Sequence, residues 1–301
     1  MSGETTLQPL RTPDPLRPGA AAHRPHHDRR QTGFRSAGFV VLLVLAVVMV
    51  FPLLWMVLTS LRSSNTVFGG PFIPTQFTVS AYREAWHTIH FGSHFLNSLV
   101  ITSLTVVGTL ALATLSGYAF AMLRFPLRNT LYFVLLSTLM MPASALIIPL
   151  YLQLKSLNLL DTRQGLVLLY IGSAAPFAMF LMRAFFETLP MELVEAARVD
   201  GAGEFRVFWR VMMPLARPGI ATVVIFQFLA TWNEFLYANT VIQTTGRLPL
   251  QPMLFTLVGQ YSTNWPALTA ALTMSVLPVI LVYVRMQRQF VAGMTLGAVK
   301  N

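Results

Sequence analysis

Ionisable and nucleophilic side chains are scarce in this chain, and their types limit the chemistry it could perform. Charged residues make up 11% of its 301 residues, and cysteine is absent, which excludes thiol catalysis, disulfides and cysteine-zinc sites. Paired-aspartate metal sites are missing too, because aspartate occurs only at positions 14, 28, 161 and 200. Ser116-Gly117 faintly resembles the serine of a membrane protease, but no long apolar segment holds a histidine to act as its base. An intramembrane enzyme is therefore kept only as a minor alternative.

Three histidines lie close together, at positions 87, 90 and 94. Spacings of three and four residues would place them on one face of a helix, which suits metal ligands. We interpret them instead as the polar face of an amphipathic segment, Ser80–His94, and predict no metal. This segment is a candidate for contact with a partner protein, as are Arg62, Arg83 and Glu84.

Motifs for nucleotides and nucleic acids are also missing. The chain has no Gly-x4-Gly-Lys-Ser/Thr loop, and neither of its two lysines, Lys155 and Lys300, follows a glycine. We expect no cofactor in this chain. The net charge of +10 does not indicate nucleic acid, because the basic residues form short runs between apolar stretches, where they orient a membrane protein.

Apolar residues make up 54% of the chain, so lipid rather than water must cover much of its surface. Six charge-poor segments are long enough to cross a hydrocarbon core at about 20 residues per span. They run approximately over Ala37–Leu58, Leu96–Leu123, Leu131–Leu152, Gln164–Met182, Pro218–Ile242 and Ala267–Val284. The prolines inside them are interpreted as tolerated kinks, with a hinge role left open; they are Pro52, Pro142, Pro149, Pro176 and Pro278. The predicted fold class is all-α, a polytopic membrane helical bundle of about six transmembrane helices.

The distribution of basic residues predicts the orientation of this bundle. With the N-terminus inside, sixteen of the 21 lysines and arginines lie on the inner side and five on the outer side. Both termini are therefore predicted to be cytoplasmic. We expect a disordered cytoplasmic tail over residues 1–36, because it lacks apolar periodicity, a transmembrane domain over 37–286, and a cytoplasmic C-terminal tail over 287–301.

The longest inner connection, residues 183–217, carries five of the chain's 11 acidic residues. Pro190 and the acids that follow it predict the start of a short helix. Asp200-Gly201 predicts its end, because glycine adopts the left-handed conformation at low cost.

A second short amphipathic helix is predicted from Glu204 to Met212, ending before Pro214. Its large apolar residues, which are Phe205, Phe208, Trp209 and Met212, are expected on or near one face. On physical grounds the two helices could form a small knob that fits a cytoplasmic partner. They could equally lie at the membrane surface and pack only against their own chain.

A resemblance favours the first interpretation. The run Glu195-Ala196-Ala197-x3-Gly201-x9-Val211-Met212-Met213-Pro214 resembles the EAA loop of ABC importer permeases, E-A-A-x3-G-x9-I-x-L-P. Val211 and Met213 depart from that pattern, both by apolar exchanges of similar size. The resemblance implies that this loop is a coupling helix that docks into a separate ATP-hydrolysing subunit. The coupling residues would be Glu195, Ala196, Ala197, Arg198, Asp200, Gly201 and Pro214.

Shorter motifs are similar to the carbohydrate-uptake, MalG-like branch of that family. They are Phe95-Leu96-Asn97-Ser98, Gly117-Tyr118-Ala119-Phe120-Ala121 and Trp232-Asn233-Glu234-Phe235. The resemblance implies a MetI-like ABC permease fold, a multi-pass location in the bacterial plasma membrane and import of a sugar or related solute. Permeases for peptides, phosphate or amino acids share the loop and remain alternatives.

The same resemblance implies several partners. They are a cytoplasmic ABC ATPase dimer that binds ATP and Mg, a second homologous permease subunit, an extracytoplasmic solute-binding protein and the lipid bilayer. No enzyme activity of its own and no nucleic-acid partner are expected for this chain.

Glu234 is the sole ionisable residue inside a predicted span, which makes it a candidate functional residue. With Trp232 and Asn233 it could face the substrate pathway, where the indole ring would stack on a sugar and the polar groups would bind hydroxyls. The alternative is that Glu234 is interfacial or pairs with the partner permease.

Overall fold

The computed structural model describes residues 29–63, 71–259 and 263–298, and within these ranges the chain forms helices and loops without a β-strand. The chain divides into two units, residues 1–51 and 52–301. Part of the predicted N-terminal tail, residues 1–28, lies outside the described ranges.

The first unit contains the beginning of α1 (Arg29–Ser60), whose residues 38–51 are all exposed. The prediction of disorder up to residue 36 is wrong from Arg29 onward, because this stretch already belongs to α1. The first four N–H groups of a helix have no acceptor within the helix, and an unpaired N–H is costly in lipid. A helix that begins before the apolar span supplies carbonyl acceptors for the first N–H groups of that span.

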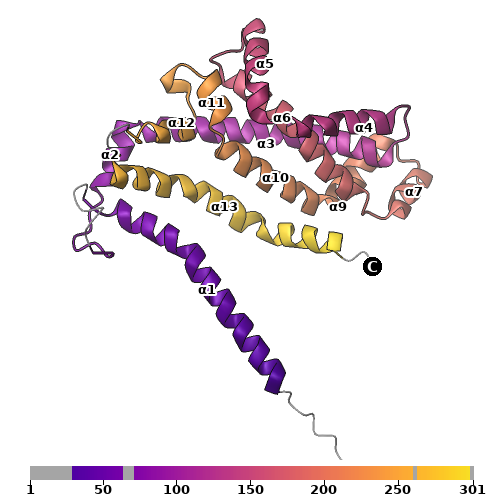
Figure 1. Cartoon of the computed structure of the whole chain (residues 1–301). Coiled ribbons are helices and arrows are strands. Elements are labelled where there is room, and N and C mark those ends of the chain that lie inside the picture. The colour runs from indigo at the N-terminus through magenta and orange to yellow at the C-terminus, as the bar shows by residue number, and fades with distance from the viewer. Residues whose placement is uncertain (1–28, 64–70, 260–262, 299–301) are drawn as a thin grey trace, which may run out of the picture. The chain divides into compact units, whose positions relative to one another are not determined.

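The second unit is centred on α3 (Phe91–Met122) and α6 (Arg163–Phe186), which pack along each other. Their approach depends on Gly117, where an added Cβ would lie 2.7 Å from the Cβ of Met182. α10 (Arg217–Trp232) packs against both helices of this pair, and α13 (Trp265–Ala298) packs against α10 (Figure 1). α13 continues past the apolar stretch that ends at Gln289, so residues 287–298 of the predicted C-terminal tail are helical.

Within the described part of the chain, four helices are long and apolar enough to cross a membrane unbroken, and they lie within α1, α3, α6 and α13. Two bent helix pairs raise the number to as many as six if each pair is one span. The prediction of about six spans is confirmed in this form. The third predicted span is not one helix, however. It consists of α4 (Arg128–Ser137), η2 (Thr138–Met140) and α5 (Ala143–Ser156), and it bends by 106°. The bend falls at Pro142, which lacks a backbone N–H and holds Met141 extended.

One end of the second unit contains α2 (Ser80–Thr88) and α12 (Leu250–Phe255), and both of them contact α3, as does η4 (Thr245–Arg247). Asn97 and Ser98, of the motif that opens α3, hold the chain there. The Asn97 amide donates to the carbonyls of Gly246 and Leu248, and Ser98 accepts from the Leu250 amide. This explains the motif by anchoring of a distant segment, a role that the sequence alone did not indicate.

Asp161 fixes the same segment from the other side, where it accepts hydrogen bonds from the Thr244 hydroxyl and from the backbone amides of Gln243 and Thr244. These bonds, the Thr244 hydroxyl first among them, lower the pKa of Asp161 to about 2. The loops between α5 and α6 and between α11 (Leu236–Val241) and α12 are thereby joined.

Two predictions for this end are wrong. Ser80–His94 is not one helix, because α2 ends at Thr88 and His90 has a left-handed backbone, so the three histidines do not share a helical face. His94 is buried and contacts the Leu248 carbonyl. Arg62, a candidate for partner contact, is also buried, and it donates to the carbonyls of Pro71 and Phe72.

Candidate functional site

The loop with the EAA-like motif begins with α7 (Met191–Val199), at the opposite end of the second unit from α2 (Figure 1). Pro190 is the N-cap residue, and Gly201 adopts a φ of 79°. The Gly201 amide donates to the Arg198 carbonyl and the Ala202 amide to the Ala197 carbonyl, which is the Schellman pattern of a glycine-terminated helix. The predicted helix and its glycine stop are confirmed.

One face of this loop is anchored on the membrane helices. Val194, Val207 and Met212 are completely buried and Phe208 nearly so. They belong to one cluster with Tyr118 of α3 and with residues of α6 and α10. Burial of each such side chain stabilises the contact by about 1.5–3 kcal/mol. The loop is therefore packed firmly against the membrane helices.

Glu204, in the second half of the loop, joins α3 and α7 through hydrogen bonds. One carboxylate oxygen accepts from the Tyr118 hydroxyl at 2.9 Å, and the other accepts from Arg198 Nε at 2.8 Å. The Arg198 guanidinium lowers the pKa of Glu204. Arg198, predicted as a partner contact, is thus engaged within its own chain. Sequence reasoning missed Glu204 and Tyr118, although Tyr118 lies in one of the quoted motifs.

The second half of the loop differs from the predicted helix with one apolar face. It consists of α8 (Glu204–Val207), η3 (Phe208–Met212, a π-helical turn) and α9 (Met213–Leu215). Pro214 lacks the N–H that an α-helix would donate to the carbonyl four residues earlier, and the turn widens before it. Phe208 and Met212 point inward, whereas Phe205 and Trp209 are 74% and 52% exposed.

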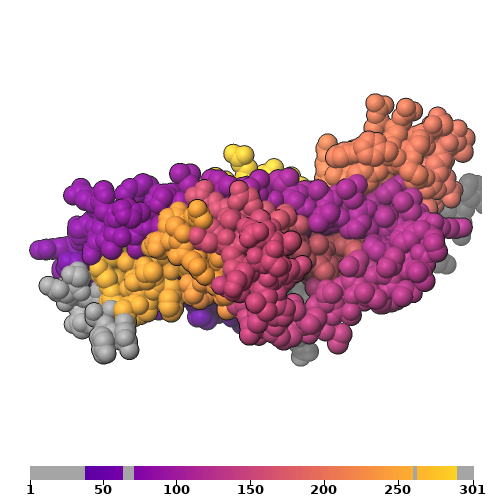
Figure 2. All heavy atoms as spheres, turned by 90° about the horizontal axis from the view of Figure 1, so that it is seen from above, coloured from indigo at the N-terminus to yellow at the C-terminus, as the bar shows by residue number. Residues whose placement is uncertain are grey.

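The outward side of the loop is small and apolar at its centre. Glu195 and Ala196 are exposed, as are Asp200, Gly201 and Pro214. Ala197 is half-buried against the anchoring cluster, so only Ala196 offers the open contact that we predicted for both alanines. The segment around residue 200 projects from the neighbouring helices in Figure 2 (salmon). This geometry suits a contact that transmits movement, because the opposite side of the loop is packed against the membrane helices.

A second candidate region lies where the fifth predicted span is interrupted. α10 ends at Trp232 and α11 begins at Leu236, so the span predicted as Pro218–Ile242 is broken rather than continuous. The Glu234 carboxylate accepts from the backbone amides of Tyr237 and Ala238 at 2.8 and 3.1 Å. It also accepts from the Tyr170 hydroxyl at 2.5 Å. Glu234 therefore caps α11, and Tyr170 of α6 holds the cap in place.

Polar side chains line a cavity of about 210 Å³ beside this interruption. Its lining consists of Tyr170, Ser173, Ala174, Gln227, Ala230, Thr231, Glu234 and Tyr237. Irregular backbone inside a membrane protein is tolerated where it lines a cavity, and polar residues in spans mark pathways. The hydroxyl, amide and carboxylate groups could bind a hydroxyl-rich solute.

The three predicted pathway residues lie in different surroundings in the structure. Trp232 is 2% exposed, stacks on Phe228 and donates from its indole nitrogen to the Ser275 carbonyl. The prediction that its ring is free to stack on a sugar is wrong, because the ring is part of the apolar core. Asn233 is exposed and contacts Gln251 of α12. Of the three, only Glu234 lines the cavity.

The apolar helices, the broken spans and the projecting amphipathic loop are those of a polytopic membrane protein. Residues 110–296 match the model of the family described as binding-protein-dependent transport system inner membrane component, and the chain belongs to this family. The chain is therefore a membrane-embedded subunit of a transport system.

Two curated relatives are similar over most of the chain. The diacetylchitobiose uptake system permease protein NgcG of Streptomyces coelicolor is 36% identical, with 90% of this chain and 89% of that protein covered. The trehalose transport system permease protein SugB of Mycobacterium tuberculosis is 34% identical, with 83% and 92% covered.

Solved structures agree with this assignment. A chain of a bacterial ABC transporter involved in the import of the acidic polysaccharide alginate has a TM-score of 0.77 at 28% identity, and 88% of this chain and 99% of that chain are covered. A chain of the MetNI methionine ABC transporter has a TM-score of 0.52 at 18% identity, with 70% and 94% covered. The second likeness concerns the fold alone.

Proposed function

We propose that this chain is a permease subunit of an ABC importer for a sugar or oligosaccharide, and that the loop over residues 183–217 couples it to a separate ATP-hydrolysing subunit. The single observation that carries the proposal is the two-sided build of the loop. Ala196 and Glu195 lie open on one side, while Val194, Phe208 and the Tyr118–Glu204 bond fix the other side to the membrane helices.

The loop would face the cytoplasm, as the inner excess of basic residues predicts. Closure of an ATPase dimer would displace α7. The buried cluster around Val194 and Phe208 would pass this displacement to α3, α6 and α10. A second permease would complete the pathway, and a soluble binding protein would deliver the solute to the opposite end. The role of the loop residues is mechanical rather than catalytic.

Two features support a sugar as the solute. The relatives named above are described as permeases for diacetylchitobiose and trehalose, and the cavity beside Glu234 offers hydroxyl, amide and carboxylate groups. Peptides, phosphate and amino acids stay alternatives, which binding measurements on the cognate solute-binding protein would separate.

The absence of cysteine allows a sharp test of coupling. A single Ala196→Cys variant of the full-length chain carries one thiol, which a thiol-to-amine crosslinker can join to a neighbour in native membranes. We expect the product to contain a protein with a Gly-x4-Gly-Lys-Ser/Thr nucleotide-binding loop, identified by mass spectrometry. Phe77→Cys, at a position 62% exposed in a segment predicted to be outside, is the matched control and should give no such product.

A transport assay complements the crosslink. Ala196→Trp should lower solute uptake by about tenfold or more while the ATPase still hydrolyses ATP, because even 1.4 kcal/mol of lost docking energy is tenfold. If Ala196→Trp transports normally and Ala196→Cys yields no ATPase product, the coupling role is refuted.

A further inference from the structure

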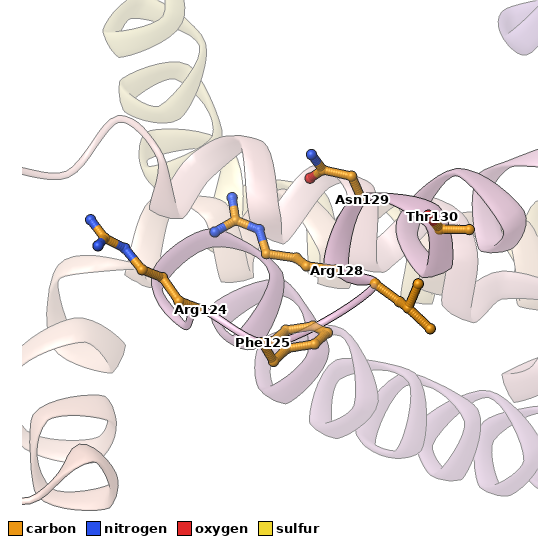
Figure 3. A pocket seen from close by; sticks show the side chains of 6 residues that line it. Arg124, Phe125, Arg128, Asn129 and Thr130 are labelled. Atoms are coloured by element: carbon orange, nitrogen blue, oxygen red, sulfur yellow. The ribbon is translucent and has the colours of Figure 1, made fainter.

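A basic pocket lies at the turn between α3 and α4, outside both regions described above. Its volume is about 630 Å³, and its lining consists of Arg124, Phe125, Leu127, Arg128, Asn129 and Thr130. Figure 3 shows the polar ends of Arg124, Arg128 and Asn129 along one side of the pocket. This turn follows Tyr118 by a few residues and so belongs to the end of the molecule that carries the coupling loop.

The two arginines of the pocket are free to bind an anion. Neither forms an ion pair with any residue that the structure describes, in contrast to Arg183, which pairs with Glu187 at 2.8 Å, and to Arg198. Arg128 Nη1 donates to the Leu123 carbonyl at 3.1 Å, which holds this guanidinium at the mouth of the turn. A guanidinium held in this way loses little side-chain entropy when it binds a phosphate.

The surface beside the pocket is apolar and exposed. Leu127 is 70% exposed at the turn, and Leu131, Phe133 and Val134 follow on α4 with exposures of 46%, 66% and 57%. Charged groups at the end of a span, next to exposed apolar side chains, match the division of a phospholipid into a headgroup and acyl chains. A soluble anion would use the arginines but not this apolar strip.

We propose that this pocket binds the headgroup of an anionic phospholipid, with the phosphodiester between Arg124 and Arg128 and the acyl chains along α4. Basic pockets between membrane helices on the cytoplasmic side are suited to such headgroups. The polar side chains of Asn129 and Thr130 would contact the glycerol portion. The inference concerns lipid binding and does not depend on the solute or on the coupling role of the loop.

The test uses native mass spectrometry of the purified full-length chain, titrated with dioleoylphosphatidylglycerol or with dioleoylphosphatidylcholine as the neutral probe. We expect tighter binding of phosphatidylglycerol, and Arg124→Gln/Arg128→Gln should weaken it by about tenfold or more, since each basic residue near a lipid surface contributes about 1 kcal/mol. Arg285→Gln/Arg288→Gln removes the same charge from exposed positions of α13 that do not line the pocket, and it should weaken binding clearly less than the pocket pair does.

The single variant Arg124→Gln is the control for misfolding, because the exposed Arg124 side chain forms no hydrogen bond or ion pair with the residues that the structure describes. Arg124→Gln should still weaken phosphatidylglycerol binding several-fold. Arg124→Lys/Arg128→Lys, which keeps the two charges, should bind phosphatidylglycerol more tightly than Arg124→Gln/Arg128→Gln does. The proposal is overturned if the control pair weakens binding equally, or if Arg124→Gln has no effect. It is also overturned if inorganic phosphate or glycerol 3-phosphate occupies the pocket and phosphatidylglycerol does not.

Discussion

The coupling loop and the interruption of the fifth span use a similar device in different surroundings. In each, a tyrosine of a membrane helix donates to a glutamate that holds a short helix, Tyr118 to Glu204 and Tyr170 to Glu234. The other partner of Glu204 is the side chain of Arg198, near water, whereas Glu234 accepts two backbone amides inside a span. An amide left unpaired in a membrane costs more than a lost surface ion pair. The two sites should therefore respond differently to the same changes.

The largest effect is expected from Glu234→Ala. It would leave the amides of Tyr237 and Ala238 and the Tyr170 hydroxyl without their acceptor, at a cost of about 2–5 kcal/mol in the free energy of unfolding. The measurement is thermal unfolding of the purified chain in detergent. Glu204→Ala is the matched change at the loop, where Tyr118 and Arg198 lose their acceptor, and it should cost about 0.5–2 kcal/mol.

Glu234→Gln separates the capping role of Glu234 from its proposed place in the pathway. Gln keeps one accepting oxygen, but its NH2 group replaces the other oxygen and faces a donor, so the chain should unfold between the wild-type temperature and that of Glu234→Ala. A change in uptake rate or in solute preference of the assembled transporter would then support the pathway role. Unchanged uptake of every solute would leave Glu234 with the capping role alone.

The tyrosines give the next largest contrast. Tyr170→Phe removes a buried donor to a carboxylate and should destabilise the chain by about 1.5–3 kcal/mol. Tyr118→Phe removes the equivalent donor at the loop, where Glu204 keeps Arg198 and solvent, and should cost about 0.5–1.5 kcal/mol. Unfolding temperatures of the two variants, measured side by side, check the order. Equal shifts would contradict the difference between the two sites.

Gly201→Ala tests the local stop signal of α7. At a φ of 79° a side chain costs roughly 1–2 kcal/mol, although an added Cβ would meet no atom within 4 Å there. We expect a modest loss of uptake through a displaced α7, with unchanged insertion in the membrane. Gly203→Ala is the control, because its Cβ also meets open space and its φ is −69°.

The smallest effect is the pH dependence of the loop. Because the folded-state pKa of Glu204 is lowered from its ordinary value of 4.5, its contribution is complete above that value and is lost as the pH falls through the lowered pKa. The side chain is about half exposed, so the loss is about 0.2–1 kcal/mol. Unfolding of wild type and Glu204→Gln, compared at pH 7 and pH 4, measures it. A larger loss on going to alkaline pH would contradict the assignment.

Most local features of the loop could be predicted from the sequence. Pro190, the acids after it and Gly201 act through their immediate neighbours on the backbone, and α7 begins and ends beside them. Two predictions failed for different reasons. The turn over Phe208–Met212 widens before Pro214, which periodicity does not take into account. The break at Glu234 is held by Tyr170, a partner far along the chain that periodicity does not reveal.

The sequence by itself determined that this chain is a membrane protein of about six spans, because apolar length and charge distribution act on each segment separately. It also determined the stop of α7, through the backbone freedom of Gly201. Only the tertiary structure decided that Trp232 belongs to the core, that Ala196 and not Ala197 lies open, and that Glu234 caps a broken helix. These outcomes depend on which side chains pack against one another, and packing is a property of the assembled helices rather than of any one segment.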